Sequence, residues 1–352
     1  MSGLQVAQSG LSGVSEGVKV VHLVPAMEQG GVESVVCNLN RALVKAGWDS
    51  VVVSRGGRLV KRIECDGGRH IALDLKSKNP LSYFCRAGAL RKILQAERPD
   101  LVCAHSRVPA WLFVWANRSL GLKWITYAHG ANSVSRYSEV MTKGDLVVSP
   151  SRFLADYLKA NYGTSETKIR VIPNCVDAER FDPSNLDRAF VEAKRREWGI
   201  RDGEHVVMAI GRITPVKGLD SLIGDVPADQ KLVIVGGADR HHLDYERRLK
   251  ASAGANVVFA GQQEKIPECI SIADEIVSAN TTKPESFGLS VVEAYAMNKP
   301  VRAKRFGGVA EIMAAVENAN AASYREAVLA LYGFDKMAER TLAVYRELTK
   351  GN

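Results

Sequence analysis

The chain alternates short apolar, β-branched runs with helical patterns, which is typical of parallel sheets whose faces are covered by helices. The first series of such runs is KVVHLVP (19–25), DSVVVS (49–54), LVCAH (101–105), KWITYAH (123–129) and LVVSPS (146–151). The second series is HVVMAIG (205–211), KLVIVGG (231–237), NVVFAG (256–261), DEIVSAN (274–280) and PVRAKRF (300–306). Two successive series predict an α/β chain of two doubly wound domains, with the boundary near residue 175.

Length and composition agree with two hydrophobic cores. The chain has 352 residues, 46% of them hydrophobic, and its apolar runs are far shorter than the roughly 18 residues of a membrane-spanning helix. Residues 1–17 lack a basic segment followed by an apolar one, so we interpret them as a disordered leader and not as a secretory signal. The cysteines are scattered without a C-x-x-C pair, which disfavours a zinc site and favours reduced thiols in a cytoplasmic protein.

The positive charge of the chain is concentrated in its first half. Residues 18–165 carry 21 Lys and Arg against 11 Asp and Glu, whereas residues 166–352 carry 26 against 27. Such an excess favours an anionic partner, either a phospholipid surface or a phosphorylated acceptor, with a generally basic solvated surface as the alternative. Nucleic acid is disfavoured because the basic residues are not interleaved with aromatic residues in a recognisable binding module.

Residues 284–297, PESFGLSVVEAYAM, combine a loop and a helix in a pattern that suits a phosphorylated ligand. Glu285 lies in the loop, and Gly288 precedes a predicted helix of about three turns over residues 289–299 that carries Glu293. The unpaired N–H groups of the first helical turn attract phosphate, and a glycine lets the ligand approach the backbone. The two carboxylates are expected to contact different parts of one ligand, a sugar and a ribose.

Other polar residues follow predicted strands, where ligands bind in open α/β sheets. These residues are Gly30 and Gly31 after residues 19–25, His105 after 101–104, His129 after 125–128, Arg212 after 206–211 and Glu285 after 274–280. Two sheets that face each other across a cleft would bring these strand ends together.

The segment P-E-x-F-G-L-x-x-x-E-A, residues 284–294, resembles the signature of the retaining glycosyltransferases of family 4, which have the GT-B fold. Four further segments agree in the same order: MEQGGVESVV (27–36), RVIPNCVDAERF (170–181), AIGRITPVKGLDSLI (209–223) and VVFAGQQEKIPECISIAD (257–274). The resemblance extends over residues 18–312. It implies two Rossmann-like domains facing a central cleft: an acceptor-side domain over 18–175, a donor domain over 176–335, and a last helix over 336–352 that crosses back to the first domain.

The resemblance also implies an activity. It predicts transfer of a hexose from a nucleotide sugar, expected to be a UDP-sugar, with retention of configuration and with neither metal nor cofactor. The expected acceptor is a lipopolysaccharide-core or other lipid-linked glycan, or a phosphorylated one, and the expected location is the cytoplasmic membrane surface. A noncatalytic sugar-nucleotide-binding partner subunit is the alternative. A nicotinamide oxidoreductase is disfavoured because PAMEQGGVE replaces the compact G-x-G-x-x-G turn.

The resemblance assigns roles to individual residues. Arg212 and Lys217 contact the diphosphate, and Glu293 binds the ribose hydroxyls. The donor sugar lies near His129 and Glu285 and near the amides of Phe287, Gly288 and Leu289; Gln262 belongs to the base-pocket segment, and Gly30 and Gly31 approach the diphosphate. Both glutamates are expected to be ionised. Each role has a simpler alternative. Arg212 and Lys217 could be surface cations, Gly30 and Gly31 could form a tight turn, and His129 could be a core histidine.

The stretch KNPLSYFCRAGALRKIL combines basic and apolar residues that could rest on a membrane interface. The residues concerned are Lys76, Lys78, Leu81, Tyr83, Phe84, Arg86, Arg91 and Lys92. An ordinary amphipathic helix with a basic outer face is the alternative. The chain also departs from the family pattern, because Cys175 stands at a turn where glycine is usual and the segment after Met313 is shortened.

Overall fold

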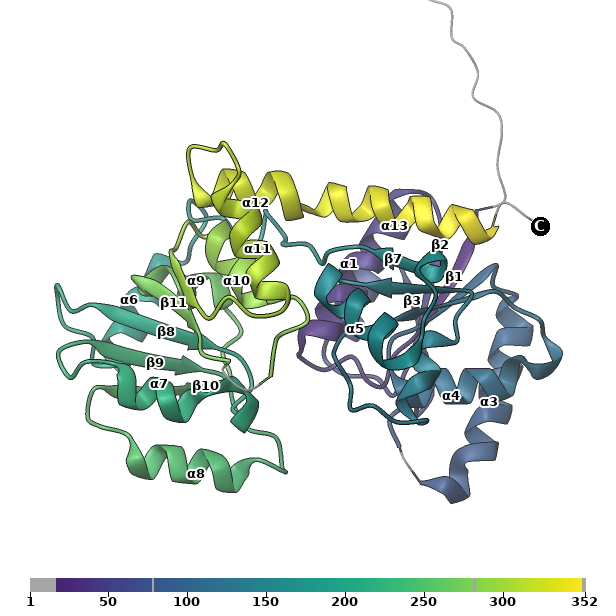
Figure 1. Cartoon of the computed structure of the whole chain (residues 1–352), viewed down its shortest axis with the longest axis horizontal. Helices are drawn as coiled ribbons and strands as arrows, with labels where there is room; N and C mark the ends of the chain where they lie inside the picture. The colour runs from purple at the N-terminus through teal and green to yellow at the C-terminus, as the bar shows by residue number, and fades with distance from the viewer. Residues whose placement is uncertain (1–16, 78, 281–282, 350–352) are drawn as a thin grey trace, which may run out of the picture.

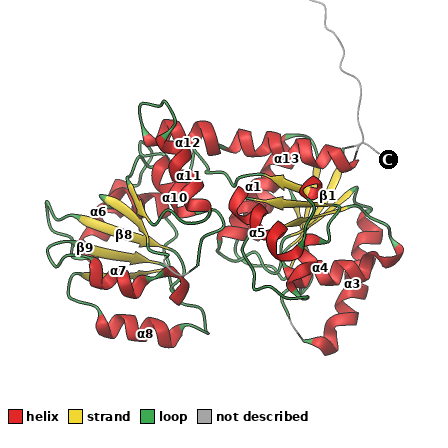
Figure 2. Cartoon of the chain, viewed as in Figure 1, coloured by secondary structure: helices red, strands yellow, loops and turns green. Residues whose placement is uncertain are grey.

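The computed structural model describes residues 17–77, 79–280 and 283–349, which form two α/β domains joined at their upper edge in the view of Figure 1. Each domain is a parallel sheet between helices, and many of the loops that follow the strands gather between the domains (Figure 2). The prediction of two doubly wound domains is therefore confirmed. The predicted leader, apart from Gly17, and Lys78 of the predicted membrane-facing stretch lie outside the described residues.

Over the described residues, the first domain contains a seven-stranded parallel sheet in the order β3-β2-β1-β4-β5-β6-β7. Its strands are β1 (Lys19–Leu23), β2 (Asp49–Ser54), β3 (Arg69–Ala72), β4 (Leu101–Ala104), β5 (Trp124–Tyr127), β6 (Leu146–Ser149) and β7 (Ile169–Val171). Its helices are α1 (Gly31–Lys45), α2 (Val60–Cys65), α3 (Tyr83–Glu97), α4 (Arg107–Ala116) and α5 (Arg152–Tyr162). The five predicted strands are its interior strands, which are mostly buried on both faces. Sequence reasoning missed β3 and β7, because these short, partly exposed edge strands lack a continuous apolar run.

The described part of the second domain contains five parallel strands in the order β10-β9-β8-β11-β12, all of them predicted. They are β8 (Val206–Ile210), β9 (Lys231–Val235), β10 (Val257–Gly261), β11 (Glu275–Ser278) and β12 (Val301–Ala303). The helices are α6 (Arg188–Glu197), α7 (Leu219–Asp225), α8 (Leu243–Ser252), α9 (Ile266–Ile272), α10 (Leu289–Ala296), α11 (Gly308–Glu317) and α12 (Tyr324–Tyr332).

Helix α10 is shorter than the sequence predicted. It ends at Ala296, because Asn298 adopts the left-handed conformation with a φ of 56° and turns the chain away. The N–H groups of Asn298 and Lys299 then donate to the carbonyls of Tyr295 and Ala294 and close the helix end. The predicted three turns become about two.

A long C-terminal helix, α13 (Phe334–Thr349), leaves the second domain and lies against α1 of the first, as the yellow helix in Figure 1 shows. Its Tyr345 is fully buried, and the Tyr345 hydroxyl lies 2.7 Å from the Tyr127 hydroxyl at the end of β5. The chain crosses between the domains a first time near Val176, which forms a bridge with Gly333. The two crossings therefore lie side by side.

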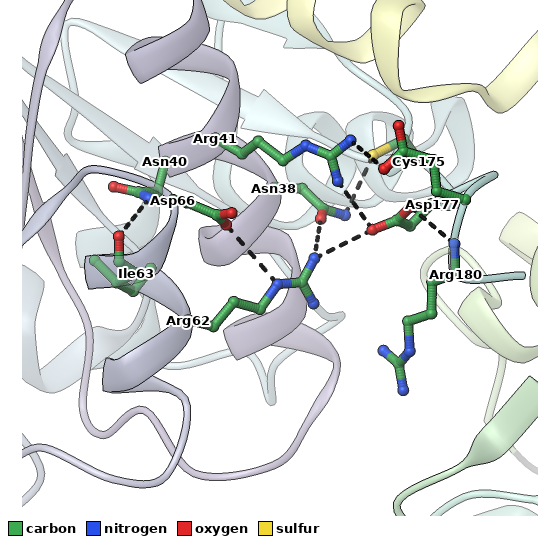
Figure 3. Close-up of polar contacts among 10 residues, drawn as sticks. Asn38, Asn40, Arg41, Arg62, Ile63, Asp66, Cys175, Asp177 and Arg180 are labelled. Carbon is green, nitrogen blue, oxygen red and sulfur yellow. Dashed lines mark hydrogen bonds and ion pairs between the residues drawn. The ribbon is translucent and has the colours of Figure 1, made fainter.

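Asp177 anchors the first crossing to the first domain (Figure 3). Its carboxylate accepts from Arg41 of α1 at 3.1 Å and from Arg62 of α2 at 3.4 Å. The neighbouring Cys175 is buried, and its sulfur accepts from the Asn38 side chain at 3.3 Å. Cys175 is not among the residues with positive φ, so the backbone at this turn does not require the glycine that the family pattern led us to expect.

Candidate functional site

A deep cleft separates the two sheets, with a cavity volume of about 1320 Å³. Typical ligand pockets have volumes of roughly 300–1,000 Å³, so this cleft has room for a nucleotide sugar and part of an acceptor. All the predicted site residues lie among its lining: Gly30, Gly31, His129, Arg212, Lys217, Gln262, Glu285, Phe287, Gly288, Leu289 and Glu293. Residues from both halves of the chain thus meet at one place.

Two cations and one carboxylate form the charged part of the donor-side wall. Arg212 follows β8 and is exposed to the cleft, while Lys217 ends a short 3₁₀ turn just before α7. The Lys217 ammonium donates to the Glu285 carboxylate, although the two residues are 68 positions apart. Sequence reasoning assigned both to the ligand but did not foresee that they pair with each other. Arg212 makes no ion pair within the described part of the chain.

The loop before α10 lies close to both domains. Gly288 has a φ of 114°, and a Cβ atom there would lie 2.7 Å from a methyl carbon of Val309, so this position requires glycine on both counts. A Cβ atom on Gly31 would lie 3.0 Å from a methyl carbon of Leu289 across the cleft. Gly31 therefore allows the first domain to approach the N-terminus of α10. The backbone of Gly30 is extended, so a tight turn does not explain this glycine.

Hydrogen bonds join the domains at several places around the cleft. The Glu311 carboxylate of α11 accepts from the backbone N–H groups of Arg152 and Phe153 at 3.0 and 2.6 Å. It thereby satisfies unpaired donors at the start of α5 with a charge that suits the helix dipole. In the cleft lining, the Gln29 side chain donates to the carbonyl of Gln263 at 3.2 Å.

Glu293 corrects one expectation. Burial raises its pKa to about 7, and the nearby Arg180 opposes this shift only in part. We expected both glutamates to be ionised, but burial shifts the pKa of Glu293 toward neutral pH and so favours its protonated form more than an exposed site would. The cause is its half-buried position on α10, where few charged groups compensate for the lost solvent.

His129 is the end of a chain of three imidazoles. Its Nε2 lies 3.0 Å from Nδ1 of His105, and Nε2 of His105 lies 3.0 Å from Nδ1 of His22. Burial lowers the pKa of His22 to about 3 and that of His129 to about 4, and it lowers the pKa of His105 well below its usual value. All three rings are therefore neutral at pH 7.

The sequence analysis placed His105 at a strand end and missed His22. His105 lines the inner part of the cleft, a recess of about 330 Å³ on the first-domain side, although only 3% of its surface is exposed. His22 lies within β1 and is fully buried. The sequence did contain a signal for His22, because it is a polar residue inside the apolar strand run KVVHLVP.

Several arginines that sequence reasoning did not assign also line the cleft. Arg41, Arg58 and Arg62 come from the first domain, and Arg180 comes from the segment after the first crossing. Arg41 and Arg62 are held by Asp177, and Arg58 pairs with Glu264 at 3.3 Å. The charge count predicted that the first half of the chain is basic. It did not predict that some of these cations line the cleft.

The stretch before and within α3 carries the exposed side chains of Lys76, Leu81, Phe84 and Lys92 and the partly buried Arg91, and we call these five residues the α3 patch. Leu81 and Phe84 are 89% and 62% exposed. Arg86 does not belong to it, contrary to our expectation, because this side chain is buried and donates to the carbonyls of Asp74, Asn79 and Ser82. Within the described ranges, no helix combines the length and apolar character needed to cross a membrane.

The described residues contain no group of three or more His, Cys, Asp or Glu side chains that could hold a metal ion. All six cysteines lie within these ranges and are free thiols.

Comparisons with known proteins place the chain in a family. Residues 29–180 match the model described as Glycosyltransferase Family 4, and residues 190–330 match Glycosyl transferases group 1. A D-inositol 3-phosphate glycosyltransferase of Segniliparus rotundus is 29% identical over 271 residues, which are 67% of this chain and 58% of that protein. The chain spans about half the length of the first curated relatives that it matches.

Solved structures show the same architecture. A glycosyltransferase from Rickettsia africae superposes with a TM-score of 0.78 at 25% identity and covers 96% of this chain and 100% of its own. The Anabaena protein Alr3699/HepE, solved in complex with UDP-glucose, superposes with a TM-score of 0.72 at 19% identity and covers 94% and 98%. The two matched models together extend over most of the chain, and the two sheets have the architecture of these structures. The chain is a family 4-like member of the glycosyltransferases with the GT-B fold.

Proposed function

We propose that the chain is a retaining hexosyltransferase that takes its sugar from a nucleotide diphosphate, most simply a UDP-sugar, without a metal ion. The observation that carries this proposal is the convergence of Arg212, Lys217 and Glu285 beside the N-terminus of α10 in one cleft. Cations and first-turn N–H groups at this place suit a diphosphate, and a carboxylate beside them suits sugar hydroxyls. The Alr3699/HepE complex with UDP-glucose supports a UDP-sugar as donor.

In this proposal the donor diphosphate takes Lys217 away from Glu285. Arg212 and Lys217 then stabilise the charge that develops as the anomeric C–O bond breaks and its electron pair moves to the phosphate oxygen. The acceptor hydroxyl attaches to the anomeric carbon on the same face, and its proton passes to the departing phosphate oxygen. Glu285, released from Lys217, accepts hydrogen bonds from the sugar hydroxyls and is not assigned as a nucleophile.

Glu293 binds the ribose as a carboxylate in this scheme. Its raised pKa means that ribose binding must favour loss of the proton, so donor binding is expected to lower the pKa of Glu293 below about 7. Gln262, on the loop after β10, lines the same cleft and contacts the base.

The acceptor is proposed to be anionic, either a lipid-linked glycan such as a lipopolysaccharide core or a phosphorylated sugar. The recess beside His105 and Arg107 belongs to the basic first domain. The relative from Segniliparus rotundus is named for a phosphorylated acceptor. The α3 patch, with two exposed apolar side chains among basic ones, supports peripheral attachment to the inner leaflet of the cytoplasmic membrane.

The proposal can be tested with a panel of UDP-, GDP- and ADP-sugars. Selective thermal stabilisation by one nucleotide would identify the donor, because a ligand that binds only the folded chain raises its apparent stability. Release of UDP from that donor, and its dependence on added acceptor, would then be measured for the parent and for Lys217→Ala. Binding without hydrolysis or transfer for any acceptor class would instead support a noncatalytic partner subunit.

A further inference from the structure

Three histidines form a diagonal line across neighbouring strands of the first sheet. His22 of β1 is paired in register with Cys103 of β4, and His105 lies two residues beyond Cys103. Ala104 is in register with Thr126 of β5, so His105 lies level with Tyr127, and His129 lies two residues further on. Each step moves one strand across and two residues toward the carboxyl edge. The line therefore starts inside the sheet and ends at the cleft.

The middle ring, His105, fixes the direction of both hydrogen bonds relative to each other. A neutral imidazole has one N–H group and one lone pair. His105 uses Nε2 toward His22 and Nδ1 toward His129, so it must donate to one neighbour and accept from the other. Hence all three rings carry the proton on Nδ1 or all three carry it on Nε2. The proton position on His129 is coupled to a ring buried two strands away.

The buried end of the line distinguishes these two arrangements. Nε2 of His22 is inaccessible to solvent and has no hydrogen-bond partner among the residues that the structure describes. If the rings carried the proton on Nε2, this end would hold a buried N–H group without an acceptor, and such orphan donors are rarer in proteins than unpaired acceptors. With the proton on Nδ1, the unpaired group is a lone pair.

We propose that His22 and His105 are positioning residues that hold the proton of His129 on Nδ1, so that the ring presents an N–H donor to the cleft. The Nε2 atom of His129 faces His105, which leaves Nδ1 as the nitrogen for a ligand. An N–H group at this position pairs with a sugar hydroxyl or a phosphate oxygen and cannot act as a general base. This consequence for the reaction rests on the proposed function, whereas the proton position does not.

The proton positions can be measured directly in the unliganded protein. Selective ¹⁵N labelling of histidine, followed by long-range ¹⁵N–¹H correlation at pH 7, distinguishes a protonated ring nitrogen from an unprotonated one. Single replacements of the seven histidines by Gln assign the signals. Free imidazole prefers the proton on Nε2, so the denatured protein supplies the contrasting reference. We expect Nδ1–H for His22, His105 and His129, and an Nε2–H ring at any of the three overturns the proposal.

Two variants test whether His22 controls His129. His22→Phe removes the buried donor and leaves His105 free to reverse, so the single Nδ1–H pattern of His129 should become a mixture of both forms. His22→Gln retains a side-chain N–H donor and should restore more of the Nδ1–H form if the Phe variant folds poorly. His241→Gln, an exposed site before α8, should leave the His129 signals unchanged. An unaltered His129 pattern in folded His22→Phe would show that the coupling does not exist.

The same variants separate this proposal from the proposed function. If UDP-sugar transfer is detected, His22→Phe should lower kcat more than it raises KM for the donor, although His22 is too deep to touch a ligand. If no transfer is detected with any donor, the NMR pattern still confirms or rejects the histidine coupling.

Discussion

The two sheets end at the cleft with different kinds of polar group. The second domain offers charged side chains, Arg212, Lys217, Glu285 and Glu293, from two loops and one helix. At the corresponding edge of its sheet, the first domain offers the end of a line of neutral, buried imidazoles. Arginines of the first domain line other parts of the cleft, so the contrast concerns only the strand ends: charged side chains suit a charged ligand group, and neutral imidazoles suit uncharged hydrogen-bonding groups.

The largest effect is expected at the charged wall. Lys217→Ala should lower turnover by about a hundredfold, since it removes a cation at the departing diphosphate and leaves Glu285 without its partner. Arg212→Ala should lower turnover by at least about tenfold, or roughly 1.4 kcal/mol of transition-state stabilisation. Steady-state UDP release would measure both effects.

Lys250→Ala is the matched control for these variants. It also removes a lysine from an ion pair, with Glu246 at 2.9 Å, but on exposed α8 away from the cleft. Exposed pairs of this kind contribute about 0–1 kcal/mol. Parental turnover in both cleft variants would mean that the second domain does not supply the charged wall.

The next effect concerns the outside of the first domain. Replacing Lys76, Arg91 and Lys92 of the α3 patch by Ser should weaken binding to anionic vesicles by at least about tenfold, given about 1 kcal/mol for each basic residue near the surface. Cosedimentation at low and moderate salt would measure it, and neutral vesicles should bind poorly. UDP-sugar binding should be unchanged.

The vesicle control is the triple replacement of Arg188, Arg196 and Lys250, which are exposed on the second domain. It removes the same formal charge from the other half of the molecule. Equal loss in the two triple variants would attribute vesicle binding to net charge alone. If the parent itself showed no preference for anionic lipid, the basic half would be better explained by a phosphorylated soluble acceptor.

Replacement of Glu293 should weaken ligand binding but stabilise the fold at alkaline pH. Glu293→Gln should weaken UDP binding by about tenfold, because an amide loses the charge-assisted hydrogen bonds to ribose. The folded pKa, raised from 4.5 to about 7, makes the parent lose stability as pH rises through that window. The variant should therefore unfold at a higher temperature than the parent at pH 8 and at a similar temperature at pH 5. Unchanged UDP affinity would remove Glu293 from the ribose site.

The three histidines should have the reverse dependence on pH. The folded pKa values of His22 and His129 are lowered from 6.5 to about 3 and about 4, so the unfolded chain binds protons first as the solution is acidified. Their contribution to stability is full above pH 6.5 and decreases toward pH 4, by up to about 1.4 kcal/mol per pH unit for each histidine. Denaturant unfolding of the parent and of His22→Phe between pH 8 and 5 would measure it. Equal slopes would show that His22 is not held neutral by burial.

The fold and the donor-side motif were accessible from the sequence for different reasons. The interior strands are continuous apolar runs, because parallel sheets are buried on both faces, whereas β3 and β7 are edge strands without that pattern. Glu285, Gly288 and Glu293 lie within nine positions, so a loop followed by a helix places them together. The end of α10 was wrong by about one turn, because its stop depends on the left-handed conformation of a single residue, Asn298.

The sequence was enough to predict the two doubly wound domains and one group of residues that line the cleft, because periodicity and strand-end position are local properties of the chain. Only the tertiary structure decided which of these residues meet. Strand order places His22, His105 and His129 on one diagonal, and the approach of two loops pairs Lys217 with Glu285. The pKa of Glu293 belongs to the same class, since it depends on burial by segments distant in the sequence. Hydrogen bonds and desolvation act over a few ångströms, and residues separated by tens of positions come that close only when the sheets are assembled.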